Sequence, residues 1–178
     1  MPTPWFRRAK ASGQLTVVNK AGAWSTAVNK ALATFNGLGF PVTLVAGTDE
    51  KNANIVVKLS MGPDSATSWG QTASTGSDFD PKKLHGLTVP LTETHERPRK
   101  TFEIIFAAIF LPGKADATAG QREVIAVHEF IHACGLDGGM PDGSKNKNQD
   151  HDSEGIMYDI MVPQGDGLIE ASKPQGVR

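Results

Sequence analysis

The stretch from Gln121 to Cys134 constrains the fold most strongly, because it combines helix signals with two histidines. Thr118 followed by Gln121 predicts a capping box at the helix start, and Gly135 is a residue type that ends helices in a left-handed conformation. Apolar residues recur between these signals, and no proline interrupts them. The sequence therefore predicts one well-delimited helix.

This predicted helix carries His128 and His132, with Glu129 directly after the first histidine. Positions i and i+4 lie on one face of a helix, so both imidazole rings can reach a common point beside it. Two imidazoles so placed can ligate one zinc ion, at ~2.0–2.1 Å from the metal. The Glu129 carboxylate points to the side of the pair, where it can take a proton from water and return it to a leaving amine. The pattern predicts a zinc hydrolase with Glu129 as general base.

A catalytic zinc ion normally takes a third protein ligand, and one more histidine stands shortly downstream. His151 follows a polar stretch that is too rich in Gly, Asp, Asn and Lys to be a helix or strand. Carboxylates also bind zinc, so Asp137 is the rival ligand, with Asp142, Asp150 and Asp152 as weaker alternatives. The choice stays open between His151, these carboxylates and a site completed by water.

The segment from His128 to Leu136, followed by His151 and Gly155-Ile156-Met157-Tyr158, resembles the metzincin signature, most closely that of the matrixin branch. In that family a glycine lets the chain bend back so that a third histidine completes the zinc site. A methionine then lies beneath the metal as an apolar floor. The resemblance implies that Gly135 and Met157 take these two places.

The chain departs from the family pattern at one point. The third histidine of the family stands three residues beyond the glycine, and that position here is Gly138. We interpret residues 137–150 as an insertion before the ligand, since surface loops tolerate insertions at little entropic cost. The resemblance then implies that His128, His132 and His151 hold one catalytic Zn²⁺.

The remaining elements are predicted from hydrophobic periodicity. A helix is marked by Trp24, Val28, Leu32 and Phe35 and ends near Gly37 or Gly39. Strands are predicted at residues 15–18, 42–45, 54–59, 86–91 and 101–111, the last of them buried on both faces. The stretch 61–80 is rich in Gly, Ser, Thr and Asp, which predicts a mobile, irregular surface loop.

The order of these elements matches the N-terminal half of the metzincin fold. The resemblance implies an α+β, zincin/metzincin-like catalytic domain over residues 1–178, with a twisted mixed sheet of about five strands packed on two helices. Zinc would lie in the cleft below the edge strand, and a peptide substrate would add to that strand. Residues 86–91 are our candidate for this rim, because Pro90 suits an edge position.

Composition agrees with one compact domain and narrows the partners. The chain has 178 residues, 39% of them hydrophobic, which suffices for a sizeable core. A net charge of −1 gives no electrostatic reason to expect binding to nucleic acid or to an anionic membrane. For the oligomeric state, we take a monomer as the default. No apolar run is long enough for a signal peptide or a membrane span, so we expect an intracellular, virion-associated or leaderless exported protein.

Other candidate ligands carry less weight. Cys134 is the only cysteine, and we expect a buried thiol. His85 and His95 match no second metal pattern, and we expect each to be exposed or hydrogen bonded. Acidic and amide side chains of residues 137–150 and 165–167 offer oxygen ligands for calcium, but no EF-hand spacing supports such a site.

The sequence thus predicts a zinc-dependent endopeptidase that acts on a peptide or protein substrate. Two alternatives remain: a zinc hydrolase acting on cell-wall peptides, and a non-catalytic zinc-containing binding or structural module. Glu129 favours an enzyme, because a purely structural zinc site has no use for a carboxylate at that position.

Overall fold

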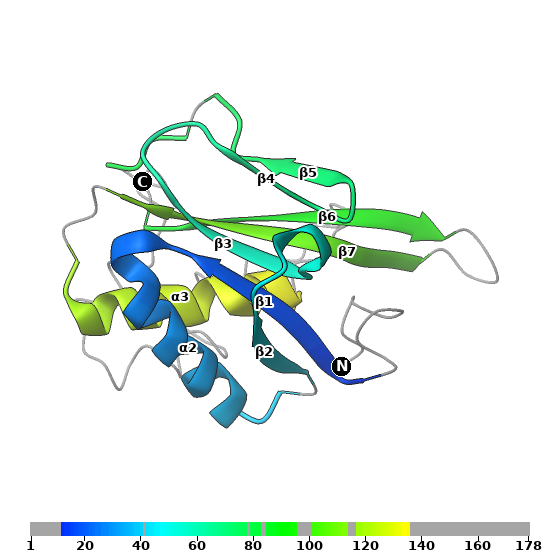
Figure 1. Cartoon of the computed structure of the whole chain (residues 1–178), viewed down its shortest axis with the longest axis horizontal. Coiled ribbons are helices and arrows are strands. Elements are labelled where there is room, and N and C mark those ends of the chain that lie inside the picture. Colours follow the sequence, from blue (N-terminus) through cyan, green and yellow to red (C-terminus); the bar gives the residue numbers. More distant parts are fainter. Residues whose placement is uncertain are drawn as a thin grey trace, which may run out of the picture.

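The computed structural model describes residues 12–40, 42–77, 79–82, 85–95, 101–113 and 117–135. Its main sheet has the strand order β2-β1-β3-β7-β6 (Figure 1). The strands are β1 (Gln14–Lys20), β2 (Thr43–Gly47), β3 (Ile55–Ser60), β6 (Leu87–His95) and β7 (Thr101–Pro112). All neighbours are parallel except β6, which runs antiparallel to β7. Within the described part of the chain, β2 and β6 therefore form the two edges of a mixed sheet.

Two helices, α2 (Ser25–Gly37) and α3 (Ala119–Cys134), lie together on one side of this sheet (Figure 1). Two short 3-10 turns, η1 (Gly22–Trp24) and η2 (Glu50–Asn52), precede α2 and β3. The α+β class, the mixed sheet of five strands and the two helices are confirmed at this level. The predicted strands and both predicted helices are found, and of the range 86–91 residues 87–91 lie in β6, an edge strand among the strands that the structure describes.

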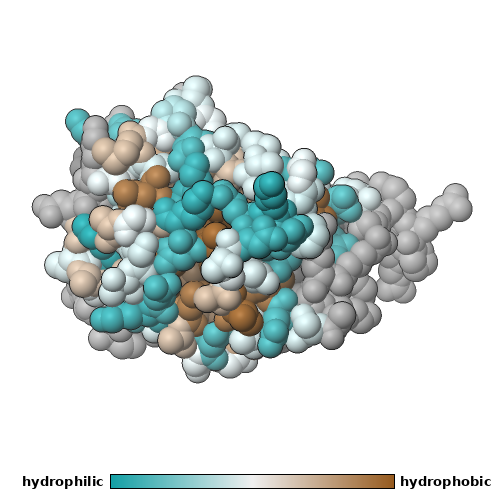
Figure 2. All heavy atoms as spheres, viewed as in Figure 1, coloured by the Kyte–Doolittle hydropathy of each residue, from teal (hydrophilic) through white to brown (hydrophobic). Residues whose placement is uncertain are grey.

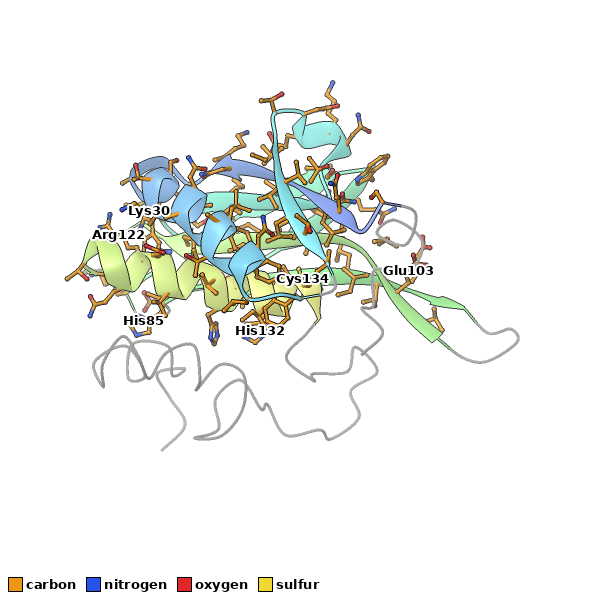
Figure 3. The ribbon with its side chains drawn as sticks, turned by 90° about the horizontal axis from the view of Figure 1, so that it is seen from below. Lys30, His85, Glu103, Arg122, His132 and Cys134 are labelled. Atoms are coloured by element: carbon orange, nitrogen blue, oxygen red, sulfur yellow. The ribbon has the colours of Figure 1, made fainter. Side chains whose placement is uncertain are left out.

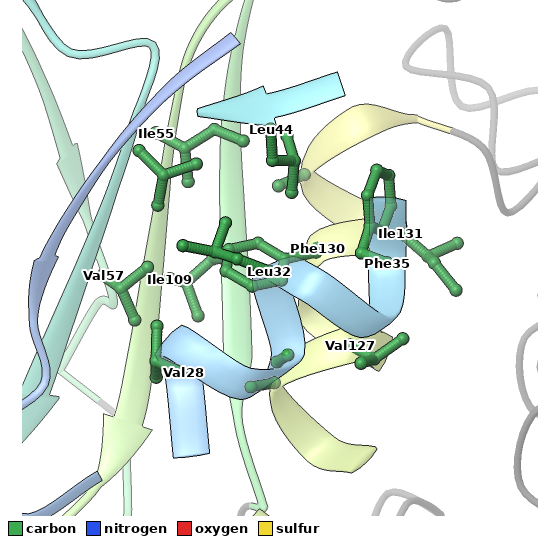
Figure 4. Packing of buried hydrophobic residues seen from close by; sticks show 14 of the residues in the cluster. Val28, Leu32, Phe35, Leu44, Ile55, Val57, Ile109, Val127, Phe130 and Ile131 are labelled. Carbon is green, nitrogen blue, oxygen red and sulfur yellow. The ribbon is translucent and has the colours of Figure 1, made fainter. Parts of the chain in front are cut away.

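The helices bury the larger apolar cluster against the sheet (Figure 4). Leu32 and Phe35 of α2 and Phe130 of α3 are each at most 8% exposed. The rings of Phe35 and Phe130 meet edge to face, with centroids 6.2 Å apart. Burial of one such side chain contributes about 1.5–3 kcal/mol, so this cluster holds α3 firmly in place.

The opposite face is covered by a hairpin of β4 (Ser65–Ser68) and β5 (Gln71–Ser74), so the prediction of an irregular loop at 61–80 was wrong. Trp69 and Gly70, with φ of 53° and 70°, form its turn. Positive φ at both turn residues matches the twist of a tight hairpin. These strands were not predicted because their buried residues are Ala66, Ser68 and Ala73, and alanine and serine are poor strand signals.

β7 is buried on both faces, as predicted for 101–111. Pairing with β6 shifts by one residue, because Leu91 faces Phe106 whereas Thr92 faces Ile104. Such a bulge reverses which side chains face each side of the sheet. On one side of the bulge, Phe106 packs toward the hairpin. On the other side, Ile104 packs toward the helices. The bulge thereby turns Ile104 toward the helices, whereas regular alternation would place it on the same side as Phe106.

The surface is mixed in character. Figure 2 shows hydrophobic residues interspersed among hydrophilic ones on the face drawn in Figure 1. Among the described residues, the exposed large apolar side chains are Leu38, Val45, Met61 and Trp69. Within the same part of the chain, no helix combines the length and the apolar character needed to cross a membrane.

Candidate metal centre

Helix α3 begins and ends as its sequence predicts. The backbone N–H of Gln121 donates to Thr118 Oγ1 at 3.2 Å, and the N–H of Thr118 donates to Gln121 Oε1 at 2.9 Å. Gly135 ends the helix in the left-handed region, with φ of 64°. These local signals fix which residues face the core and which face the candidate site.

Polar contacts add to the apolar packing of α3. Arg122 donates from Nη1 to the backbone oxygen of Ala23 at 3.3 Å, and its guanidinium lies 5.2 Å from the ring centroid of Trp24. Thr34 of α2 donates to Glu123 Oε1 at 2.8 Å. The first turns of α3 are therefore tied to η1 and α2.

The imidazoles of His128 and His132 converge beside α3. Their Nε2 atoms are 3.0 Å apart, and their rings meet at 76° with centroids separated by 4.6 Å. Two Zn–N bonds at a tetrahedral angle would hold the nitrogens ~3.3 Å apart, so the observed separation is close to that of two ligands on one ion. Without metal, the same separation suits an N–H···N hydrogen bond whose direction depends on the tautomers.

The carboxylate of Glu129 is turned toward the edge strand β6. Glu129 is only 5% exposed. Thr88 Oγ1 lies 2.6 Å from Glu129 Oε2 and 3.2 Å from the main-chain oxygen of Glu129, and it can donate to either. The short contact to the carboxylate is typical of a charge-assisted hydrogen bond.

Gly86, just before β6, lies against the same carboxylate. A Cβ atom at this position would be 2.5 Å from Glu129 Oε1, 2.8 Å from Cδ and 2.9 Å from Cγ. These separations are far below van der Waals contact. The side chain of Glu129 therefore occupies the space that a larger residue at position 86 would need.

The other predicted ligands lie outside the described residues: His151, its rivals Asp137, Asp142, Asp150 and Asp152, the insertion 137–150, and Met157. Among the residues that the structure does describe, no three His, Cys, Asp or Glu side chains form a metal-binding group. The structure thus brings together the two histidines of α3, and the third ligand stays a prediction.

His85 is set apart from the histidine pair. In Figure 3 it lies toward the start of α3, whereas His132 lies near the end of the helix. His85 is half-buried, and burial lowers the pKa of its imidazole. Cys134 is fully buried, as expected, and burial raises the pKa of its thiol. The side chain of His95 lies outside the described part.

Thr88 and Gly86 are the two contacts of the site that sequence reasoning missed. Strand alternation contained a signal for them, because positions 86 and 88 point to the same side of a strand. On β6 that side faces the helices, since Leu87, Val89 and Leu91 pack toward the hairpin. The partner on α3 could not be read from this alternation.

No protein-family model matches the chain, and no curated protein matches its sequence. The resemblance to metzincins therefore depends on the residues of the chain itself. Of these, His128, Glu129 and His132 lie in the described part, with the geometry given above.

Proposed function

We propose that this protein is a zinc-dependent endopeptidase. His128, His132 and His151 hold the ion, and Glu129 is the general base and then the general acid. The observation that carries the proposal is the convergence of the two Nε2 atoms, 3.0 Å apart, on the helix that also carries a buried carboxylate. Imidazole nitrogens are preferred zinc donors, so the donor set fits the metal.

When bound, zinc supplies Lewis acidity, which lowers the pKa of water and polarises a carbonyl group. The residues of the chain do the rest. His128, His132 and His151 would hold the ion, and Glu129 would take a proton from the attacking water and deliver it to the nitrogen of the leaving amine. Because Glu129 is 5% exposed, the proton stays in a site with little bulk water.

The edge strand supports a peptide as substrate. Within the described residues, β6 pairs with β7 on one side only. Glu129 contacts Thr88, which belongs to this strand, and Gly86, which directly precedes it. An extended peptide that added to the outer edge of β6 would pass close to the carboxylate, and main-chain hydrogen bonds would hold it.

The first test is the zinc content of purified protein by elemental analysis. We expect one zinc ion per chain, and we expect His128→Ala and His151→Ala each to lose or greatly weaken binding. Asp137→Ala and the matched histidine control His85→Ala should keep it. Zinc that survives His151→Ala but not Asp137→Ala would move the third ligand, and no zinc in the wild type would contradict the proposal.

The second test is hydrolysis by zinc-loaded Glu129→Gln. We expect a loss of roughly 100-fold or more with zinc content unchanged, because the amide cannot carry the proton. Glu123→Gln on the same helix is the matched control and should retain cleavage, since Glu123 contacts Thr34 away from the histidines. Labelled casein and peptidoglycan, assayed side by side, separate a protein substrate from a cell-wall peptide. Undiminished cleavage by Glu129→Gln would contradict the mechanism.

A further inference from the structure

We propose that the edge strand β6 positions the general base Glu129. Thr88 is a positioning residue that holds the carboxylate, and Gly86, just before the strand, leaves the room that the carboxylate occupies. This inference rests on the proposed function, since it assigns a role to the neighbours of Glu129. It adds a second structural element to a site that sequence reasoning confined to α3 and the segment after it.

Thr88 holds one oxygen of the carboxylate. Its hydroxyl lies 2.6 Å from Glu129 Oε2, and both side chains are at least half-buried. A hydrogen bond to an ionised acceptor is about twice as strong as one between neutral groups. A glutamate has three rotatable side-chain bonds, and ordering such a side chain costs entropy that this contact offsets.

Gly86 confines the other oxygen. An added Cβ would lie 2.5 Å from Oε1, closer than Cβ atoms approach other atoms in real proteins. Gly86 does not have a positive φ, so its φ does not by itself require glycine. Space beside Glu129, and not backbone conformation, is therefore what position 86 requires of its side chain.

The two contacts act on one group from the same strand. Thr88 sets the direction of Oε2, and Gly86 allows Oε1 to approach the backbone of the strand. A general base works best when it is held in the reactive geometry before the substrate arrives. The strand that pairs with an extended peptide would then also aim the base at it.

Steady-state kinetics test the role of Thr88, with a fluorogenic peptide made from a site that the wild type cleaves in casein. We expect Thr88→Val to lower kcat by roughly 10- to 100-fold, as for other residues that orient a site from behind. KM and zinc content should stay near wild type. Thr88→Ser keeps the hydroxyl and should restore kcat to within a few-fold. Thr43→Val, an exposed threonine on the opposite edge strand β2, is the control.

Position 86 is tested in the same assay. Gly86→Ala should lower kcat at least as much as Thr88→Val, because the methyl group displaces the carboxylate. Gly120→Ala on α3 is the control, since a Cβ there meets no atom within 4 Å. If Gly86→Ala and Thr88→Val both retain the kcat of their controls in an active enzyme, the inference is overturned and the proposed function stands.

A readout without zinc or catalysis separates the two proposals. In metal-free protein, Thr88→Val should lower the Tm more when Glu129 is present than in a Glu129→Ala background, where Thr88 still has the main-chain oxygen of residue 129 as a partner. Equal shifts in both backgrounds would show that the two side chains are not coupled, which would overturn the inference. A wild type that cleaves no substrate would instead overturn the proposed function, even where the coupling in the metal-free protein is found.

Discussion

The two edges of the sheet are each tied to a helix by one polar side chain, but in opposite directions. At β2, Asn36 of α2 reaches the strand: its Nδ2 donates to the backbone oxygen of Leu44 at 2.9 Å, and the backbone N–H of Leu44 donates to its Oδ1 at 2.8 Å. At β6, Thr88 reaches from the strand to the carboxylate of Glu129 at 2.6 Å.

The contact at β2 serves the stability of the sheet, whereas the contact at β6 involves a residue of the candidate site. The amide of Asn36 imitates a neighbouring strand, because it satisfies both outward-facing main-chain groups of Leu44. Such a device protects an edge against pairing with another chain. At β6 the bond is made by a side chain and ends on a group that can carry a proton. The same kind of contact thus protects the main chain at one edge and orients a carboxylate at the other.

Removal of the metal should have the largest effect on activity, and it should leave the fold unchanged. Treatment with a chelator should abolish hydrolysis, and added zinc should restore it. The fold should persist, because the cluster that holds α3 to the sheet is apolar and contains neither histidine. Circular dichroism and hydrolysis measured on the same sample check this. Unfolding on chelation would show that the metal holds α3 and not only the chemistry.

Asn36→Ala should give the reverse result. Loss of both bonds leaves the main chain of Leu44 without these partners and should lower the free energy of unfolding by about 1–3 kcal/mol. Urea denaturation measures this loss, and Lys30→Ala, an exposed position on the same helix, is the control. The kcat of the folded protein should not change. A fall in kcat as large as that of Thr88→Val would remove the distinction between the edges.

Asp64 lies next to the hairpin and at neither edge of the sheet. Its substitution should have the smallest effect on stability. Burial acts to raise the pKa of Asp64, but hydrogen bonds from Lys58 (2.7 Å), Ser60 (2.9 Å) and the backbone of Ser65, together with the Lys58 charge, outweigh it and hold the pKa below its usual 3.8. A lowered pKa means that this stabilisation is present above the unfolded-state pKa and is lost as pH falls through the folded-state value.

Asp64→Asn should therefore lower stability near neutral pH by a few tenths to about 1 kcal/mol, the usual range for a partly exposed ion pair. The difference from wild type should vanish in acid, below the lowered pKa. Thermal unfolding measured from neutral pH into acid checks both the size and the sign. A difference that grows as the pH falls would contradict the assignment.

Prediction from sequence succeeded where the signals are local. Helix α3 is fixed by Thr118 and Gln121 at its start and Gly135 at its end, all close to the residues they organise. The histidine pair follows from a spacing of four within that helix. The strands were predicted because branched and aromatic residues fill them. Ala66 and Ala73 gave no such signal, although they are as buried as the larger residues.

The half of the site on β6 could not be predicted because its contacts are not local. Thr88 and Glu129 are 41 positions apart in the chain. Alternation places Thr88 on one side of a strand, but only the packing of α3 beneath that strand decides what it meets. Position 86 was read as the start of a rim, and the close approach of a carboxylate to Gly86 depends on the same packing.

That separation of 41 positions also has a consequence for folding. The histidine pair needs only the turns of α3, so it can form as soon as that helix does. The carboxylate meets Thr88 only after β6 has paired with β7 and the finished sheet has received α3, and such distant contacts form late. A chain still folding would have this histidine pair before its general base is aimed. Activity would then begin only after the sheet is complete.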